Sequence, residues 1–265
     1  MTEAAKKPYV SISSFALKII AMVTMALDHT AVAFSLPNIL RAIGRLAFPL
    51  YALMAIDSYL HLKGDPKRLK RYFVTLCILA AVSELGYNFV DHGTWLYTGP
   101  QNQILQFVAF LAGIIIADTT DKIFPKVIVW GAVIVFNCFW GLGYGGSGIV
   151  LMLGLCIYLG RFREQTLPKR VLALCGVFLI YYISIGLEYG IIPRLLSEHR
   201  YGPLALIRTA LSGIYAECAS VFVIPVIVLY NGEYGSIPKG FKWIYRVFYP
   251  VHLYLLAFLK AFVFI

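Results

Sequence analysis

Asp28 and His29, adjacent residues near the end of an apolar run that includes Lys18, are the side chains with the clearest capacity for chemistry. Lys18 and His29 are eleven positions apart, so on a helix both face the same side, ~16 Å apart along the axis. A histidine can accept a proton from an attacking amine or hydroxyl group, and a neighbouring carboxylate can stabilise or orient the charged ring. If the run crosses a membrane, burying these groups costs at least ~2.5 kcal/mol, which makes them candidate functional residues. The alternative is a hydrogen-bonded pair that only holds this run to its neighbours.

Charged side chains in the next two apolar runs offer partners for this pair. Arg41 and Arg45 are four residues apart, so they share one face of a helix, at a depth similar to that of His29. Arg45 is the deeper of the two and is expected to pair with Asp28 or with Glu84, an acid in the outer half of the third run. The alternative for both arginines is to extend towards the membrane interface without a role in chemistry.

Amides, tyrosines and a second histidine add to the polar residues. Four amides at the start of the fourth run are more than a helix cap requires, and they predict a polar cavity: Gln101, Asn102, Gln103 and Gln106. His252 follows Tyr249 and a proline in the last run, close to the expected cytoplasmic start of that run. Tyr144 lies in a glycine-rich turn that lacks the Gly-Lys-Ser/Thr pattern of a phosphate-binding loop. No two histidines have metal-ligand spacing on one helix face, so we predict no metal.

The composition indicates which elements must position these residues. Of the 265 residues, 60% are hydrophobic and 14% are charged, whereas soluble domains contain about 25% charged residues. We therefore expect an all-α protein, a polytopic transmembrane helical bundle forming one domain over residues 1–265, with residues 1–14 as a cytoplasmic N-terminal segment. About nine spans are predicted, with eight and ten left open by the ambiguous region 188–230: 15–34, 39–60, 72–90, 101–117, two within 127–160, 171–187, 204–230 and 247–265.

The stretch 127–160 is divided into two spans because of its length. It contains no Asp, Glu, Lys or Arg, but as a single helix it would be ~51 Å long and would exceed the ~30 Å hydrocarbon core. The glycine-rich segment 141–148 is the predicted turn between the two spans.

Lysines and arginines are distributed asymmetrically between the predicted loops. Most lie in loops on the same side as the N-terminus: 63–71, 122–126, 161–170 and 239–246. The positive-inside rule then predicts a multi-pass protein of the inner or plasma membrane, with a cytoplasmic N-terminus and an external C-terminus. We therefore interpret much of the net charge of +10 as a topological signal and expect no nucleic-acid partner.

Several short stretches, in order from residue 17 to 253, carry a resemblance to a known family. They are Leu17-Lys-Ile-Ile-Ala with Leu27-Asp-His29, Gly44-Arg-Leu-Ala-Phe-Pro49, Ser83-Glu84, Gln101-Asn102, Gly143-Tyr-Gly-Gly-Ser-Gly148, Leu229-Tyr-Asn-Gly232 and Phe248-Tyr-Pro-Val-His252. Together they resemble the TraX family, which is named for the pilin N-acetylase of conjugative plasmids. The spacing of Lys18 and His29 also resembles the Arg/Lys-x10-His signature of the wider type-three membrane acyltransferases.

The resemblance implies a transmembrane acyltransferase that uses acetyl-CoA or a related acyl-CoA from the cytoplasm. It leaves the acceptor open, so a pilin N-terminus, a cell-envelope glycan or another amine or hydroxyl remains as a partner beside the lipid bilayer. Acyl transfer from a thioester needs proximity, a base for the nucleophile and a donor for the developing oxyanion.

The candidate residues fit these roles. His29 is the expected general base and Asp28 its helper, while an acyl-His29 intermediate stays open. Arg45 or the amides of Gln101 and Asn102 are expected to contact the oxyanion or the acceptor. The remaining substrate-binding candidates are Glu84, Tyr144, Tyr249 and His252. The phosphates of CoA cannot enter hydrocarbon, so they are expected to bind cations on the cytoplasmic side, namely Lys18, Lys239, Lys242 and Arg246.

Two other classes of protein compete with the acyltransferase hypothesis. A secondary transporter would also place buried charge at mid-depth, usually with broken helices and internal repeats, and no repeat is evident in this sequence. A structural membrane subunit would not require Asp28, His29 and Lys18 on one span.

Overall fold

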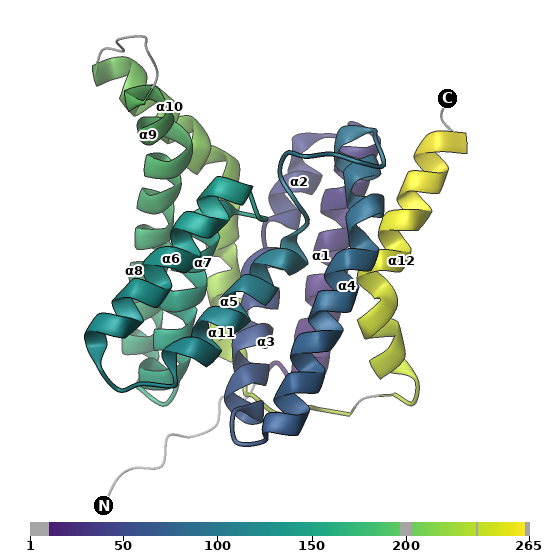
Figure 1. The fold of residues 1–265 in the computed structure, drawn as a ribbon. Helices are drawn as coiled ribbons and strands as arrows, with labels where there is room; N and C mark the ends of the chain where they lie inside the picture. Colours follow the sequence, from purple (N-terminus) through teal and green to yellow (C-terminus); the bar gives the residue numbers. More distant parts are fainter. Residues whose placement is uncertain (1–10, 197–202, 237, 263–265) are drawn as a thin grey trace, which may run out of the picture.

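The computed structural model describes residues 11–196, 203–236 and 238–262, and within these ranges it contains helices and no β-strand. The predicted all-α fold is therefore confirmed. Most helices run side by side between the two ends of a bundle, and the described chain starts at one end and finishes at the other (Figure 1).

The described ranges contain fifteen helical segments, labelled as in Figure 1. They are α1 (Ser14–Ala33), α2 (Asn38–Gly44), α3 (Ala47–Leu62), α4 (Pro66–His92), α5 (Gln103–Ala117), α6 (Ile123–Trp140), α7 (Gly145–Ile157), the π-helix η1 (Tyr158–Phe162), α8 (Leu167–Ile185), the π-helix η2 (Gly186–Ile191), α9 (Ile192–Leu195), α10 (Pro203–Glu217), the 3₁₀-helix η3 (Cys218–Val223), α11 (Ile224–Leu229) and α12 (Phe241–Phe262).

Seven continuous or nearly continuous helices are long and apolar enough to cross a membrane: Ser14–Ala33, Asn38–Leu62, Pro66–His92, Ile123–Trp140, Gly145–Phe162, Leu167–Leu195 and Leu204–Leu229. α5 is apolar but has 15 residues, and α12 has 22 residues. α5 and α12 lie at the positions of the predicted fourth and ninth spans, so the described residues contain seven candidate spans and two further helices in the order predicted. The stretch 127–160 forms two spans as expected, because Gly141 ends α6 in the left-handed conformation (φ +61°).

The second predicted span is broken into α2 and α3, and Arg45 lies at the break. In a continuous helix Pro49 would have no N–H to donate to the carbonyl of Arg45, and its ring would clash with that carbonyl. Pro49 instead occupies the first turn of α3, where proline is tolerated. Gly44 lets α2 approach α1 closely, because a Cβ there would lie 2.2 Å from Cβ of Asp28. The break therefore brings Arg45 next to Asp28.

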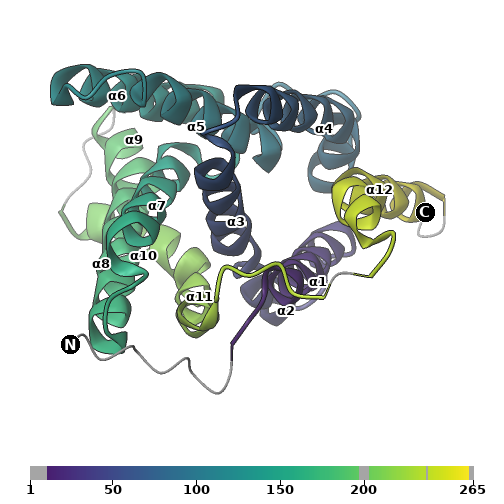
Figure 2. The same cartoon turned by 90° about the horizontal axis from the view of Figure 1, so that it is seen from below.

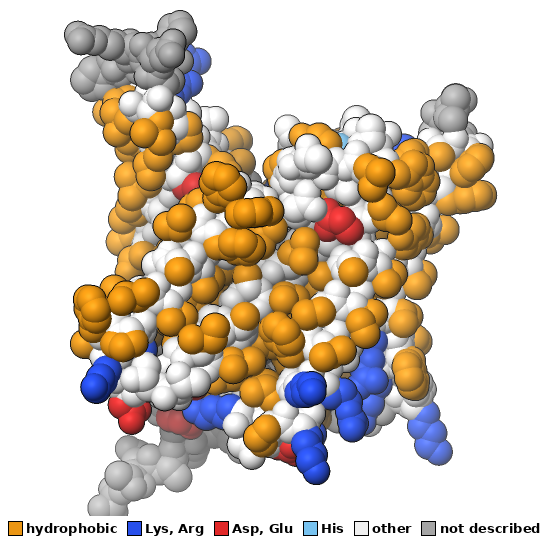
Figure 3. Space-filling view, viewed as in Figure 1, with side chains coloured by type: hydrophobic (Ala, Val, Ile, Leu, Met, Phe, Trp, Pro, Cys, Tyr) orange, Lys and Arg blue, Asp and Glu red, His pale blue; other side chains and the backbone are white. Residues whose placement is uncertain are grey.

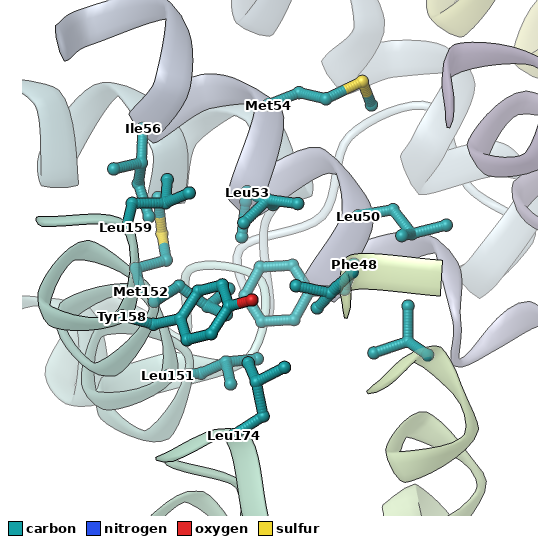
Figure 4. Packing of buried hydrophobic residues seen from close by; sticks show 14 of the residues in the cluster. Phe48, Leu50, Leu53, Met54, Ile56, Leu151, Met152, Tyr158, Leu159 and Leu174 are labelled. Carbon is teal, nitrogen blue, oxygen red and sulfur yellow. The ribbon is translucent and has the colours of Figure 1, made fainter. Parts of the chain in front are cut away.

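α3 lies in the middle of the bundle, between α1 and α7 (Figure 2). Its buried face packs against α7, η1 and α8 (Figure 4). This face includes Phe48, Leu53 and Ile56, and it meets Leu151, Met152, Tyr158, Leu159 and Leu174, whereas Met54 points away towards α12. In a bilayer, close packing of this kind holds helices together, because lipid is as apolar as the side chains. α6, in contrast, exposes most of its apolar residues, as expected for a lipid-facing helix.

Basic residues gather at one end of the bundle (Figure 3). This basic end carries the connections before α4, α6, α8 and α12, and the opposite end is called the site end below. Buried Asp57 ties three segments together at the basic end: Arg163 lies 3.2 Å from Oδ1, and the Tyr230 hydroxyl donates to Oδ2 at 2.7 Å. Burial and this contact with Asp57 raise the pKa of Tyr230 well above its usual range.

Candidate functional site

His29 lies near the end of α1 and contacts a second histidine from α12. Its Nδ1 is 2.7 Å from Nε2 of His252. Nδ1 of His252 is in turn 2.8 Å from the carbonyl oxygen of Phe248. The Phe248 ring stacks on the His252 ring with centroids 4.8 Å apart, and Tyr249 presents its edge to both imidazoles. The two histidines, treated separately in the sequence, form one unit in the structure.

The expected position of His252 near the start of the last span is wrong. α12 begins at Phe241 rather than at residue 247, because the basic residues Lys242 and Arg246 are part of the helix. His252 is therefore ~16 Å into the helix, which places it at the depth of His29.

Asp28 does not contact the ring of His29 in the way expected of a helper. Adjacent side chains on a helix diverge by ~100°. Oδ1 of Asp28 lies 3.5 Å from Nε of Arg41, and Oδ2 lies 3.6 Å from Nη1 of Arg45. Among the described residues, the hydrogen-bond partner of His29 is His252. Asp28 therefore orients two guanidinium groups beside His29.

Arg45 is the centre of a buried ion-pair cluster. Its Nε lies 3.2 Å from Oε1 of Glu217, and its Nη1 donates to the Tyr144 hydroxyl at 2.9 Å. The side chains of Arg45, Asp28 and Glu217 are only 13%, 15% and 12% exposed. Removing a guanidinium from water is costly, and several partners are needed to offset that cost. Glu84, the other expected partner, accepts a hydrogen bond from Asn102 instead.

Glu217 is the member of this cluster that was not predicted as a site residue. It ends α10, where the predicted eighth span changes into the 3₁₀-helix η3. A buried acid in an apolar span was a signal of function, but nothing in the sequence showed which cation it faces.

A glycine-rich turn positions Tyr144. Gln106 donates from Nε2 to the carbonyl of Gly145 at 2.6 Å, and its Oε1 accepts the N–H of Tyr144 at 3.1 Å. The Tyr144 ring stacks on Phe48 with centroids 4.4 Å apart. The turn thus acts as a support for the hydroxyl that contacts Arg45.

Glu188 holds the other side of this turn. Its carboxylate accepts the N–H groups of Gly146 at 2.9 Å and Ser147 at 2.7 Å, at the N-terminus of α7 where the helix dipole favours a negative charge. Gly145 adopts φ +58°, and a Cβ there would lie 2.0 Å from Oε1 of Glu188. The N-terminus of α7 is therefore occupied by a side chain of the protein itself.

A polar cavity of about 150 Å³ lies beside His29 at the site end. Its walls come from α1, α2, α4, α5, α12 and the turn before α7. They consist of Asp28, His29, Val32, Arg41, Arg45, Tyr87, Asp91, Gln103, Gly143, Tyr144 and Tyr249. A cavity of this volume holds a group the size of a benzene ring, which is enough for an acetyl group and the atom that attacks it.

The positions of Gln101 and Asn102 contradict their expected role as contacts of the oxyanion or acceptor. α5 begins one residue later than Asn102, which caps it by accepting the N–H of Ile104 at 3.0 Å. The Asn102 amide donates to the carbonyl of Ala80 and to Glu84, and the Gln101 amide donates to backbone carbonyls of its own loop. Gln101, Asn102 and Glu84 therefore hold the backbone next to the site and do not line the cavity.

Gln103 takes the place of these amides in the cavity wall. Its side-chain nitrogen is buried and has no hydrogen-bond partner among the described residues. The four amides predicted a polar cavity, and Gln103 is the one of them that lines it. The described residues contain no group of three His, Cys, Asp or Glu side chains that could hold a metal.

The expected donor-binding cations lie at the basic end. Nζ of Lys18 lies 5.0 Å from the centre of the Tyr245 ring, and Lys18 interacts electrostatically with Lys242. Lys239, Lys242 and Arg246 are exposed, and the Arg246 guanidinium lies over the Trp243 ring. α1 and α12 pack against each other. Lys18 and Lys242 lie at the basic end of this contact, and His29 and His252 meet further along it.

Comparison with known proteins agrees with the family resemblance. The family described as TraX protein matches residues 13–260. The probable fimbrial assembly protein FimC of serogroup H1 from Dichelobacter nodosus is 24% identical over 270 residues, which cover 96% of this chain and 98% of that protein. No solved structure matches the chain. Since the family match extends from the start of α1 to α12 and includes the whole cavity, this chain belongs to the TraX family.

Proposed function

We propose that this protein is a membrane acyltransferase that moves an acetyl or other short acyl group from acyl-CoA to an amine or hydroxyl, with His29 as general base. The observation that carries the proposal is the position of His29 in the cavity wall. One of its ring nitrogens is held by His252, and Nε2 makes no hydrogen bond within the described part of the chain. A histidine that is oriented by a third group and has a ring nitrogen facing a cavity is the arrangement expected of a general base.

The proposed reaction begins with proton transfer to His29. Nε2 of His29 takes the proton of the acceptor N–H or O–H while the acceptor atom attacks the thioester carbonyl. The carbonyl oxygen becomes an oxyanion, and the guanidinium of Arg45 and the free amide of Gln103 are the donors on the cavity wall. The carbon–sulfur bond then breaks, and the CoA thiolate takes the proton back from His29. The products are the acylated acceptor and the free thiol of CoA.

The two substrates approach from opposite ends of the bundle in this proposal. The charged part of acyl-CoA stays at the basic end near Lys18 and Lys242, because phosphates cannot enter hydrocarbon. Lys18 and His29 are ~16 Å apart along α1, a distance that an extended pantetheine arm covers. The acceptor then reaches the cavity from the site end, where the ends of α1 and α4 form its walls.

The acceptor that we propose first is the N-terminal amine of a fimbrial or pilus subunit. The support for it is the relative described as a probable fimbrial assembly protein, which aligns with nearly the whole chain. A cell-envelope glycan is the second acceptor, because the same base can deprotonate a hydroxyl group.

The test uses the purified protein in lipid nanodiscs with radiolabelled acetyl-CoA. Acceptors are a pilin-type peptide with a free N-terminus, the same peptide with a blocked N-terminus, and a hydroxyl-bearing glycan. Release of CoA thiol and transfer of label are measured together. We expect His29→Gln to lower the rate by about 10²–10⁴-fold, whereas His61→Gln, at the basic end, leaves it unchanged. A His29→Gln variant with more than a tenth of the wild-type rate would exclude His29 as the base.

A secondary transporter is the alternative, and one observation favours it. Two spans are discontinuous at the ion-pair cluster, one at Arg45 and one after Glu217, and broken helices of this kind are common in transporters. Solute uptake into liposomes without label transfer to any acceptor would support this alternative.

A further inference from the structure

We propose that His252 is a positioning residue that holds His29 in the tautomer whose Nε2 is unprotonated. The proposal rests on the proposed function, because it states how the same base is prepared for its reaction. It assigns to the last span a role that is separate from binding either substrate.

The positions of the ring hydrogens follow from a hydrogen-bonded chain formed by the Phe248 carbonyl, the His252 ring and the His29 ring. The carbonyl of Phe248 can only accept, so Nδ1 of His252 must carry a hydrogen to make their 2.8 Å contact. When both rings are neutral, Nε2 of His252 is then an acceptor, and Nδ1 of His29 must donate to it across 2.7 Å. Nε2 of His29 is left with its lone pair free. The hydrogen-bond network thus assigns the tautomer that a base at the cavity needs.

The ring of His252 is held in a fixed orientation. Its own carbonyl partner is four residues earlier on α12, so the two move together as parts of one helical turn. The Phe248 ring lies nearly parallel to the His252 ring, with an interplanar angle of 12°, and Tyr249 contacts it edge-on with centroids 5.6 Å apart. A residue that selects a tautomer must be rigid in this way, because rotation of its ring would exchange acceptor and donor atoms.

A histidine suits position 252 because the carboxylate nearest in sequence to His29, Asp28, has other partners. Asp28 pairs with Arg41 and Arg45, so it does not offer its oxygen to Nδ1 of His29. A neutral ring provides an acceptor for that nitrogen without burying a further charge.

Two substitutions separate positioning from packing. His252→Gln places a carbonyl oxygen near the position of Nε2 and keeps an acceptor for His29, whereas His252→Phe keeps the shape of the ring and removes the acceptor. We expect His252→Phe to lower kcat by about 10²-fold or more and His252→Gln to retain most of the activity, with KM for acetyl-CoA unchanged in both. The opposite order, with the Phe variant active and the Gln variant inactive, would show that His252 only fills space.

A spectroscopic measurement tests the proposal without any acyl transfer. ¹⁵N chemical shifts of histidine-labelled wild-type protein in nanodiscs distinguish protonated from unprotonated ring nitrogens, and His29→Gln identifies the signals of His29. We expect His29 to be protonated at Nδ1 and unprotonated at Nε2. The reverse tautomer would overturn the proposal even in an active enzyme. The expected tautomer in a protein that transfers no acyl group would instead leave the positioning role intact and remove the proposed function.

Discussion

Arg45 joins three segments of the chain through one side chain. It reaches Asp28 on α1, Glu217 at the end of α10 and Tyr144 in the turn before α7. The planar guanidinium suits this position, because its fork of donors can satisfy several acceptors at once and it keeps its charge when buried. Arg41 contacts the same Asp28, but its side chain is 43% exposed. The two arginines therefore differ in what they contribute, although they share one helix face in the sequence.

Replacing each arginine by glutamine makes this difference measurable. We expect Arg45→Gln to destabilise the protein by about 3–5 kcal/mol, because it leaves Asp28 and Glu217 buried without their shared cation. Arg41→Gln should cost about 0–1 kcal/mol, since the Arg41 side chain is 43% exposed and Asp28 keeps Arg45 as a partner. Thermal or denaturant-induced unfolding of the detergent-solubilised protein gives the loss of unfolding free energy in each variant. Equal losses in the two variants would contradict the central position of Arg45.

At the scale of elements, the site depends on the close contact of α1 and α2. Gly44 permits this contact, and Pro49 stops the helix from continuing through Arg45. α4 and α5 contribute their ends to the same cavity, because Asn102 caps α5 and fixes Gln103 in its wall. Breaks and caps, rather than the middles of long helices, therefore present most of the polar side chains at the site.

A methyl group at Gly44 tests this contact. We expect Gly44→Ala to cost about 1–3 kcal/mol by overpacking, because its Cβ would lie 2.2 Å from Cβ of Asp28 and 2.9 Å from Cα of Asp28. The matched control is Gly131→Ala in α6, where a Cβ meets no atom within 4 Å. The control should be neutral or more stable by up to about 1 kcal/mol, because alanine favours the helix. Similar stability of the two variants would mean that α1 and α2 are further apart than described.

At the scale of the whole molecule, most basic residues and the polar cavity lie at different ends. Lysines and arginines gather at the basic end (Figure 3). The cavity includes His29 and Asp91, near the opposite ends of α1 and α4. α4 alone spans from Lys67 at the basic end to His92 at the site end. If the basic end faces the cytoplasm, acyl-CoA and an external acceptor meet at His29 from opposite sides.

Cysteine labelling determines which end faces the cytoplasm. Lys67→Cys and Leu96→Cys are introduced separately after replacement of the five native cysteines, and intact cells are treated with a membrane-impermeant maleimide. The side chain of Leu96 is 82% exposed, in the loop between α4 and α5. We expect labelling of Leu96→Cys in intact cells and of Lys67→Cys only after permeabilisation, as the positive-inside rule requires. The reverse pattern would invert the topology and separate the cavity from an external acceptor.

Donor binding at the basic end is tested with a pair of neutralised cations. Lys18→Gln combined with Lys242→Gln should raise KM for acetyl-CoA and change kcat little, because phosphate contacts act equally in the ground state and the transition state. Lys122→Gln combined with Lys126→Gln removes the same charge at the same end but near α6. Equal effects of the two pairs would indicate a general influence of surface charge and remove Lys18 and Lys242 from the donor site.

The amino-acid sequence by itself determined the class of fold and the direction of side chains within each helix. Long apolar runs with few charges can satisfy their backbone groups in lipid only as helices, so the helical bundle follows from composition and length. Spacing of four residues placed Arg41 and Arg45 on one face, and both contact Asp28 in the structure. These properties are local, and a single sequence contains them.

Only the tertiary structure decided which partners meet. His29 and His252 are 223 positions apart. Arg45 meets Asp28, one of its two expected partners, and Glu217 in place of the other, Glu84. Such contacts depend on the depth and rotation of each helix, which shift when a helix starts a turn and a half earlier, as α12 does, or breaks at a proline, as the second span does. Helical periodicity fixes angles within one helix but not the register between two helices, and the site is built from that register.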